Sequence, residues 1–168
     1  FDALALEDVL LSPLELAQAY GIFAAEGVHY GQKIDDKLTT TSVLEMRDAE
    51  GEIWLDWQKA EAQPIVSAEL AYLINDILSD SSARWESLGT DNALEVDFSA
   101  AAKIGRVDDG LSAWTIGYTP QRLALVWAGA DEALDPESAA GIWHAVMSAA
   151  NENAPSLGWN APVGITRM

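Results

Sequence analysis

The feature that most constrains the fold is a series of short apolar segments between residues 98 and 128. These segments are 98–107, 113–118 and 123–128, and their connections are Asp108-Asp109-Gly110 and Thr119-Pro120-Gln121-Arg122. Apolar segments of this length, joined by such short turns, favour an antiparallel β-meander. Ser138 then precedes an alanine-rich stretch and predicts a helix over 139–151. The predicted fold class is α/β in the α+β sense, an antiparallel sheet flanked by helices.

The sequence before the meander predicts two helices and a hairpin. Ser12, Pro13 and Glu15 are typical of a helix start, so a helix is predicted over 13–26. A hairpin is predicted over 43–56, and Ser67 precedes a second helix predicted over 68–78. Residues 79–97 and the tail after the last helix are predicted to be irregular. Since there is no repeat or linker, one domain is expected over 1–168.

Charge and composition exclude several classes of function. The 168 residues carry 27 acidic and 9 basic side chains, a net charge of −18, so no nucleic-acid partner is expected. The absence of cysteine excludes disulfides and thiolate sites. His29 and His144 have no ligand spacing around them, and neither a metal nor a cofactor is predicted.

Seven tryptophans are many for a chain of this length. Those in periodic segments are predicted to be core residues rather than a ligand platform: Trp54, Trp114, Trp127 and Trp143. Trp57, Trp85 and Trp159 lie near the ends of elements and are weaker candidates for lining a groove.

Lys103 is the one cation in the apolar segment Ala100-Ala101-Ala102-Lys103-Ile104-Gly105. Lysine on an edge strand protects a sheet against aggregation, and local sequence alone favours that interpretation. The order of the following motifs favours a functional one. Lys103-Ile104-Gly105-Arg106 is followed by Trp114-Thr115-Ile116-Gly117-Tyr118-Thr119-Pro120, then Val126-Trp127-Ala128-Gly129, then a helix containing Trp143.

This order resembles the C-terminal half of the transpeptidase domain of class A penicillin-binding proteins, closest to the 1C-like branch. In that family the order is K-T-G-T, W-x-x-G-Y-T-P, V-W-x-G and a final helix with a tryptophan. Pro13-Leu14-Glu15-Leu16-Ala17 and Ala71-Tyr72-Leu73 also resemble its helices. The resemblance covers nearly the whole chain and implies a partial penicillin-binding protein/β-lactamase-like fold.

The resemblance also implies roles for individual residues. Lys103 would supply positive charge beside the substrate, Gly105 would allow close approach of its backbone, and the N–H of Arg106 would be an oxyanion donor. Lys103, Ile104, Arg106 and Ser112 stand at substrate-binding positions, but the family has hydroxyl residues where Ile104 and Arg106 stand and aspartate where Ser112 stands. Arg106 would either hold a carboxylate itself or block the groove.

The chain contains no S-x-x-K and no S-x-N, the motifs that supply the nucleophile and proton relay in this family. We therefore expect a fragment whose nucleophile-bearing part and membrane anchor lie upstream, in an extracytoplasmic protein. The expected function is part of a serine transpeptidase that cross-links peptidoglycan stem peptides and binds β-lactams. The alternatives are a degenerate domain that binds peptidoglycan or a protein without chemistry, and an unrelated acidic binding domain. A fragment should also expose an apolar sheet face, to be covered by the missing half or a second copy.

Overall fold

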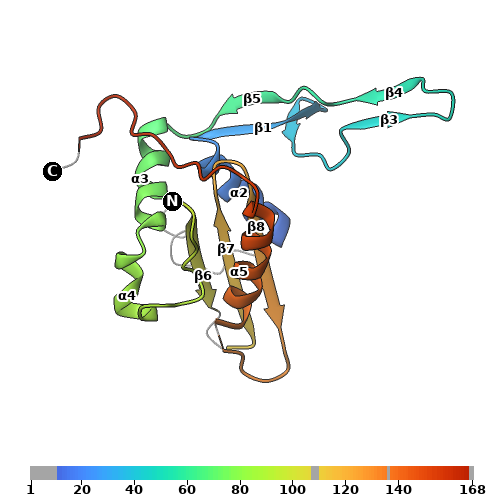
Figure 1. Ribbon diagram of the computed structural model, residues 1–168. Helices are drawn as coiled ribbons and strands as arrows, with labels where there is room; N and C mark the ends of the chain where they lie inside the picture. Colours follow the sequence, from blue (N-terminus) through green and yellow to red (C-terminus); the bar gives the residue numbers. More distant parts are fainter. Residues whose placement is uncertain (1–10, 107–109, 136, 167–168) are drawn as a thin grey trace.

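The computed structural model describes residues 11–106, 110–135 and 137–166, and its centre is the predicted meander (Figure 1). The sheet order is β6-β7-β8, with strands β6 (Ala101–Arg106), β7 (Ser112–Tyr118) and β8 (Leu123–Gly129). All pairings are antiparallel, and Lys103 lies opposite Ile116 while Trp114 lies opposite Trp127. β6 and β8 are the two outer strands of this sheet.

Helix α5 (Glu137–Asn151) packs on one face of the sheet and forms the core with it. Trp143 is fully buried, and its indole Nε1 donates to the carbonyl of Gly117 at 3.3 Å. A side chain at Gly117 would collide with this ring, because an added Cβ would lie 2.3 Å from a ring carbon. The buried cluster on this face consists of Leu94, Ala100, Ala102, Ile104, Ala140, Trp143 and Met147.

Helices α2 (Pro13–Ala24) and α3 (Ala68–Ser79) cover part of the opposite face, next to Tyr118. The Tyr118 hydroxyl donates to the side chain of Asn75 at 2.8 Å, and Asn75 in turn donates to the carbonyl of Phe23 at 2.8 Å. This chain of hydrogen bonds ties β7, α3 and α2 together. Burial raises the pKa of the Tyr118 hydroxyl, and the nearby Tyr20 adds to the increase.

The C-terminal tail returns to the beginning of the described chain. Trp159 donates its indole N–H to the carbonyl of Ala24 at 3.1 Å, across 135 residues of sequence. Its ring lies edge-on to Tyr118, with 5.6 Å between ring centroids. The tail has no regular structure, as predicted, but its tryptophan fixes the end of α2 against the sheet.

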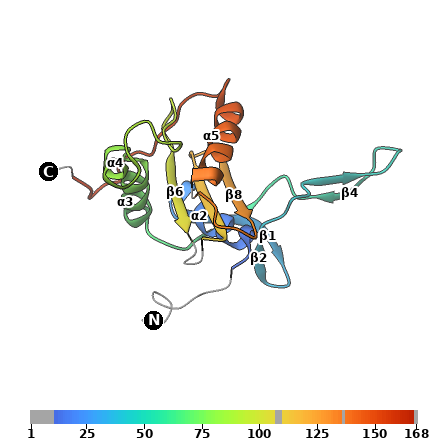
Figure 2. The ribbon, with the colours of Figure 1, turned by 90° about the horizontal axis from the view of Figure 1, so that it is seen from below.

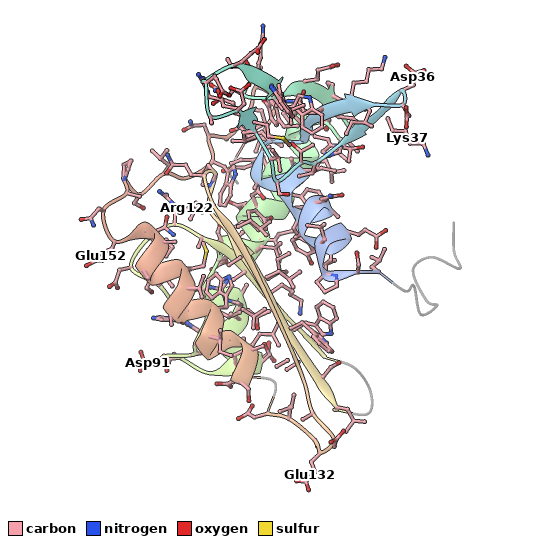
Figure 3. The ribbon with its side chains drawn as sticks, turned by 90° about the vertical axis from the view of Figure 1, so that its right-hand side faces the viewer. Asp36, Lys37, Asp91, Arg122, Glu132 and Glu152 are labelled. Carbon is pink, nitrogen blue, oxygen red and sulfur yellow. The ribbon has the colours of Figure 1, made fainter. Side chains whose placement is uncertain are left out.

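A second sheet, not predicted from the sequence, follows α2. Its order is β2-β1-β5, and the strands are β1 (Val28–Ile34), β2 (Lys37–Thr39) and β5 (Glu61–Pro64). The predicted hairpin is present as β3 (Glu45–Arg47) and β4 (Ile53–Asp56), and it extends away from the rest of the molecule (Figures 1 and 2). Side chains at the turn between β1 and β2, among them Asp36 and Lys37, point outward (Figure 3).

The other predicted elements are confirmed with small changes at their ends. At the start of α2, Ser12 and Glu15 form a reciprocal cap, in which the Ser12 amide donates to the Glu15 carboxylate at 2.8 Å. Residues 79–97 were predicted to be irregular, but they contain a short helix, α4 (Ser82–Leu88). The predicted fold class, an antiparallel sheet flanked by helices, is confirmed among the described residues.

Candidate functional site

The candidate site is the outer edge of β6, where Lys103 lies. Lys103 pairs with Ile116, and Gly105 pairs with Trp114, so these residues share the sheet face that points away from α5. The side chain of Lys103 is exposed, and its ammonium group donates to the carbonyl of Ile104 at 2.9 Å. Lys103 is thus a solvent-accessible cation beside a strand whose outer edge pairs with no strand among the described residues.

Ile104 lies on the opposite face and belongs to the core. Only 9% of its surface is exposed, and it packs in the same cluster as Trp143 and Met147. The residue directly across from it is Thr115, whose hydroxyl is buried and has no hydrogen-bond partner in the described part of the chain. The apolar side chain at position 104 therefore fills the core and presents no polar group on the face of Lys103.

The remaining predicted site residues lie toward the far end of β6. Gly105 has little room for a side chain, since an added Cβ would lie 3.2 Å from the Cβ of Trp114. The backbone of Arg106 pairs with Ala113, but its side chain lies outside the described residues. Ser112 is half-buried at the start of β7, about 13 Å along that strand from Ile116. The structure thus brings Lys103, Gly105 and the Arg106 backbone together, and leaves Ser112 at a distance from Lys103.

A groove of about 510 Å³ lies between β6 and the two helices α3 and α4. Its lining is mainly apolar, with two basic residues and no carboxylate: Ile77, Leu78, Ala83, Arg84, Ser87, Leu88, Leu94, Ala102, Lys103 and Ile104. In a chain with a net charge of −18, two cations without an acidic neighbour in the lining define a local preference for an anionic, partly apolar ligand.

Arg84 is a groove residue that the sequence analysis did not identify as a site residue. Its guanidinium donates to the carbonyl of Leu78 at 2.7 Å and to the hydroxyl of Ser81 at 3.1 Å, and its Nε is buried without a partner. Burial lowers the pKa of Arg84, against the opposing effect of Glu95 and Asp80. The sequence around Arg84, which follows Asp80 by four residues, did not mark it as a site residue, because only the fold brings it opposite β6.

The tryptophans are distributed differently from the prediction. Trp143 is a core residue, as predicted, but Trp54 and Trp127 are 73% and 54% exposed, so their assignment to the core was wrong. Trp127 lies beside Trp114 on the face of Lys103, with ring centroids 6.0 Å apart. Trp85 does not appear in the groove lining, although it belongs to α4.

The antiparallel meander, its final helix and the lysine on the outer strand define a transpeptidase-like α/β fold. PonA1 of Mycobacterium tuberculosis, a penicillin-binding protein, matches with a TM-score of 0.75 at 19% identity, over 100% of this chain and 48% of that one. Penicillin-binding protein 1A of Haemophilus influenzae matches with a TM-score of 0.78 at 18% identity, over 97% of this chain and 30% of that one. These matches establish the fold.

Sequence comparison identifies the relatives. Penicillin-binding protein 1A of Clostridium acetobutylicum is 27% identical over 158 residues, covering 91% of this chain and 18% of the relative. The same-named protein of Neisseria lactamica is 25% identical over 173 residues, covering 92% of this chain and 19% of the relative. No family model matches the chain. The homologues of this chain are therefore class A penicillin-binding proteins, which confirms the resemblance found in the sequence.

The chain spans less than a fifth of the length of these curated relatives. The matches do not separate the 1A from the 1C-like branch, so that assignment stays a prediction. Among the described residues, none of the helices has the length and apolar character needed to cross a bilayer. The same residues contain no group of three or more side chains suited to hold a metal ion.

Proposed function

We propose that this chain supplies the lysine-strand wall of a serine transpeptidase site that cross-links peptidoglycan. The observation that carries the proposal is the exposed Lys103 on the outer edge of β6, above an apolar groove without carboxylates. The motifs around it match the order found in penicillin-binding proteins, and the homologues carry that name. Residues 1–168 would form the C-terminal part of one transpeptidase domain.

In the proposed reaction, a serine attacks the carbonyl carbon of the penultimate residue of a stem peptide ending in D-Ala-D-Ala. The peptide C–N bond breaks, the terminal D-alanine leaves with a proton on its nitrogen, and a serine ester remains. An amine of a neighbouring stem peptide then attacks the ester, forms the cross-link and releases the serine. The proposed reaction requires no oxidant, metal or cofactor to account for the bonds formed and broken.

The residues of this chain would bind and orient the donor peptide. Lys103 would attract the terminal carboxylate, because it is one of two cations at the groove and no acidic side chain lines it. The open edge of β6 would pair with the extended peptide backbone, and Gly105 would leave space for its close approach. The amide of Arg106 would donate to the oxyanion.

The nucleophile would come from outside residues 1–168, since the sequence contains no S-x-x-K and no S-x-N. We also propose that the part of the domain that carries it covers the open sheet face around Trp114 and Trp127. Burial of Trp127 would shift tryptophan emission to shorter wavelength in the longer protein. Equal emission from the longer protein and from residues 1–168 would contradict this arrangement.

Labelling of the full-length protein with a fluorescent penicillin tests the proposed chemistry. We expect a covalent band that disappears when the S-x-x-K serine is replaced by alanine, and that weakens at least 10-fold with Lys103→Ala. Lys103→Arg, which keeps the charge, is the matched control and should retain more label than Lys103→Ala. A folded protein that takes no label would contradict the proposed acyl transfer and favour a non-catalytic domain.

A cell-wall function also implies a location. We propose that the whole protein acts on the outer side of the cytoplasmic membrane, held there by a segment outside residues 1–168. We expect a protease added to intact spheroplasts to cleave the protein. In untreated cells the protein should be recovered in the membrane fraction. Recovery of the full-length protein, uncut, from the soluble cytoplasmic fraction would contradict the proposal.

A further inference from the structure

The hairpin of β3 and β4 is the part of the molecule that the proposed peptide site does not use. Figures 1 and 2 show it extending away from the sheet that carries Lys103. Its most exposed aromatic residue is Trp54, with 73% of the surface accessible. An indole this exposed contributes little to folding, because it has not been removed from water. Its position on a projecting element calls for another role.

The indole of Trp54 is held in place despite its exposure. Its Nε1 donates to the Asp48 carboxylate at 3.2 Å. The other oxygen of Asp48 accepts from the amides of Glu50 and Glu52, at 3.1 and 2.8 Å, and so fixes the turn of the hairpin. A ring tethered at its edge to a fixed turn keeps its flat faces available for contact.

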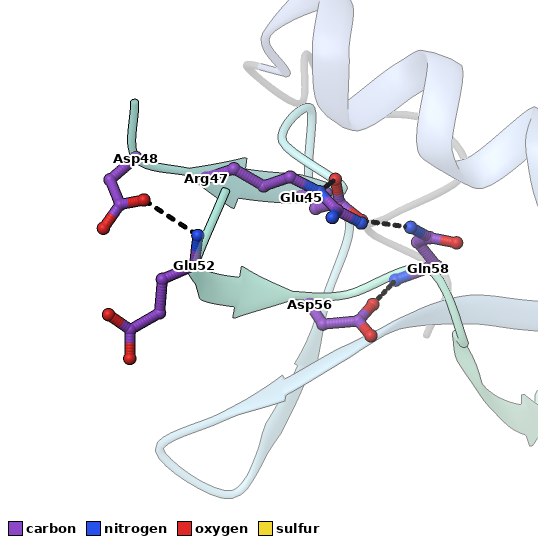
Figure 4. Close-up of polar contacts among 6 residues, drawn as sticks. All are labelled: Glu45, Arg47, Asp48, Glu52, Asp56 and Gln58. Atoms are coloured by element: carbon purple, nitrogen blue, oxygen red, sulfur yellow. Dashed lines mark hydrogen bonds and ion pairs between the residues drawn. The ribbon is translucent and has the colours of Figure 1, made fainter. Parts of the chain in front are cut away.

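A connected set of polar side chains lies on the same hairpin (Figure 4). The Glu45 carboxylate accepts from two guanidinium nitrogens of Arg47 and from the Gln58 side chain. The Asp56 carboxylate accepts from the Gln58 amide at 3.1 Å and lies opposite Glu45. Asp56 follows Trp54 by two residues in β4, and Trp54 lies at an irregularity of the pairing, between Ile53, which pairs with Arg47, and Leu55, which pairs with Met46.

We propose that this hairpin surface, defined by Trp54, Glu45, Arg47, Asp56 and Gln58, binds a neutral glycan chain. A pyranose ring has an apolar face of C–H groups, which stacks on an indole, and a rim of hydroxyls, which both donate and accept hydrogen bonds. Carboxylate, guanidinium and carboxamide groups beside the indole provide both kinds of partner. The surface therefore combines the two kinds of contact that a sugar ring requires.

Charge favours a neutral sugar over an anionic ligand. Arg47 is paired with Glu45, while the carboxylates of Glu50 and Glu52 at the turn accept no hydrogen bond or ion pair in the described structure. The hairpin is thus acidic within a chain of net charge −18. An anionic polymer would be repelled here, whereas hydroxyl and acetamido groups bring no opposing charge.

The identity of the glycan rests on the proposed function, since a peptidoglycan transpeptidase encounters stem peptides attached to glycan strands. The hairpin would hold the strand while the lysine edge of β6 takes the peptide. Because the two surfaces belong to different elements, sugar binding and penicillin labelling can be measured independently. Failure of one does not imply failure of the other.

Calorimetric titration of the full-length protein tests the inference with two neutral probes, chitohexaose and peptidoglycan glycan strands stripped of stem peptides by an amidase and then methyl-esterified at the lactyl carboxylates that the amidase exposes. We expect saturable binding of both, weakened at least 10-fold by Trp54→Ala and less by Trp54→Phe, which keeps an aromatic face. Met46→Ala is the matched control, because Met46 is 50% exposed on the same hairpin but points to the side opposite Glu45 and Arg47.

Two results would overturn the inference. One is the absence of saturable heat with both probes for a protein that still takes up fluorescent penicillin. The other is a loss of binding with Met46→Ala that equals the loss with Trp54→Ala, which would indicate an apolar protein-docking surface instead. Retention of penicillin labelling by Trp54→Ala confirms that the variant is folded and that its peptide site is intact.

Discussion

A side chain added at Gly117 would collide with the ring of Trp143, which occupies the space where a Cβ would lie. We expect Gly117→Ala to lower the free energy of unfolding by about 1–3 kcal/mol, since the ring must move within a packed core. The control is Gly141→Ala in α5, where an added Cβ meets no atom within 4 Å. Equal urea midpoints for the two variants would contradict this packing.

Thr115 carries a buried hydroxyl without a partner, directly across from Ile104. Replacing the hydroxyl by a methyl group in Thr115→Val removes an unsatisfied polar group at nearly constant volume. We expect the unfolding free energy to rise by about 1 kcal/mol. In an Ile104→Thr background the two hydroxyls can bond across the strands, so the gain from Thr115→Val should vanish. Urea unfolding of the four proteins in this cycle measures both effects.

The raised pKa of Tyr118 makes the unfolding free energy depend on pH in the alkaline range. Its pKa is raised by burial, so the folded protein keeps the hydroxyl neutral where an unfolded chain, with a pKa of about 10, ionises it. The resulting contribution to stability is complete below pH 10 and is lost as the pH rises toward the folded pKa. We expect stability to fall more steeply above about pH 10 for the wild type than for Tyr118→Phe. Parallel curves from urea unfolding would exclude this coupling.

At the scale of elements, the hairpin of β3 and β4 is separable from the rest of the fold. Its side chains bond mainly within the hairpin, and its connection to the body includes the Gln32 side chain, which donates to the carbonyls of Trp57 and Lys59. Replacing residues 45–56 with a short glycine linker should change the melting temperature by less than about 3 °C. A larger decrease, measured by circular dichroism, would show that the body depends on the hairpin.

The elements also show what sequence patterns can predict. The meander and α2 carried strong local signals, namely apolar segments with short turns and the Ser12–Glu15 cap, and both are present. The sheet β2-β1-β5 was missed because its strands alternate poorly and its pairing of β1 with β5 joins residues about 30 positions apart. The sequence also could not show that Ile104 lies on the sheet face that packs against α5. That depends on the strand register, which the local sequence does not specify.

At the scale of the molecule, the central sheet has two outer strands, β6 and β8, whose outer edges pair with no strand in residues 11–106, 110–135 and 137–166. β8 is entirely uncharged and apolar, and such an edge promotes association. The net charge of −18 opposes association, but salt screens it. We expect residues 1–168 expressed alone to associate increasingly between 0.05 and about 0.5 M NaCl, as measured by light scattering.

The substitution Trp127→Lys, which adds a charge to β8, should reduce this association, whereas Lys103→Ala, which removes the charge from β6, should increase it. A monodisperse monomer at every salt concentration would show that neither edge is accessible. In that case Lys103, which the proposed site uses to attract a carboxylate, would not be needed to prevent association at the edge of β6.

The contact between Trp159 and α2 has a consequence for synthesis of the protein on the ribosome. Helix α2 is synthesised before Trp159, and the carbonyl of Ala24 and the ring of Tyr118 gain this partner only when Trp159 has been added. This contact therefore cannot form until residue 159 has left the exit tunnel. A nascent chain stalled just before Trp159 would leave the end of α2 exposed to proteases and chaperones.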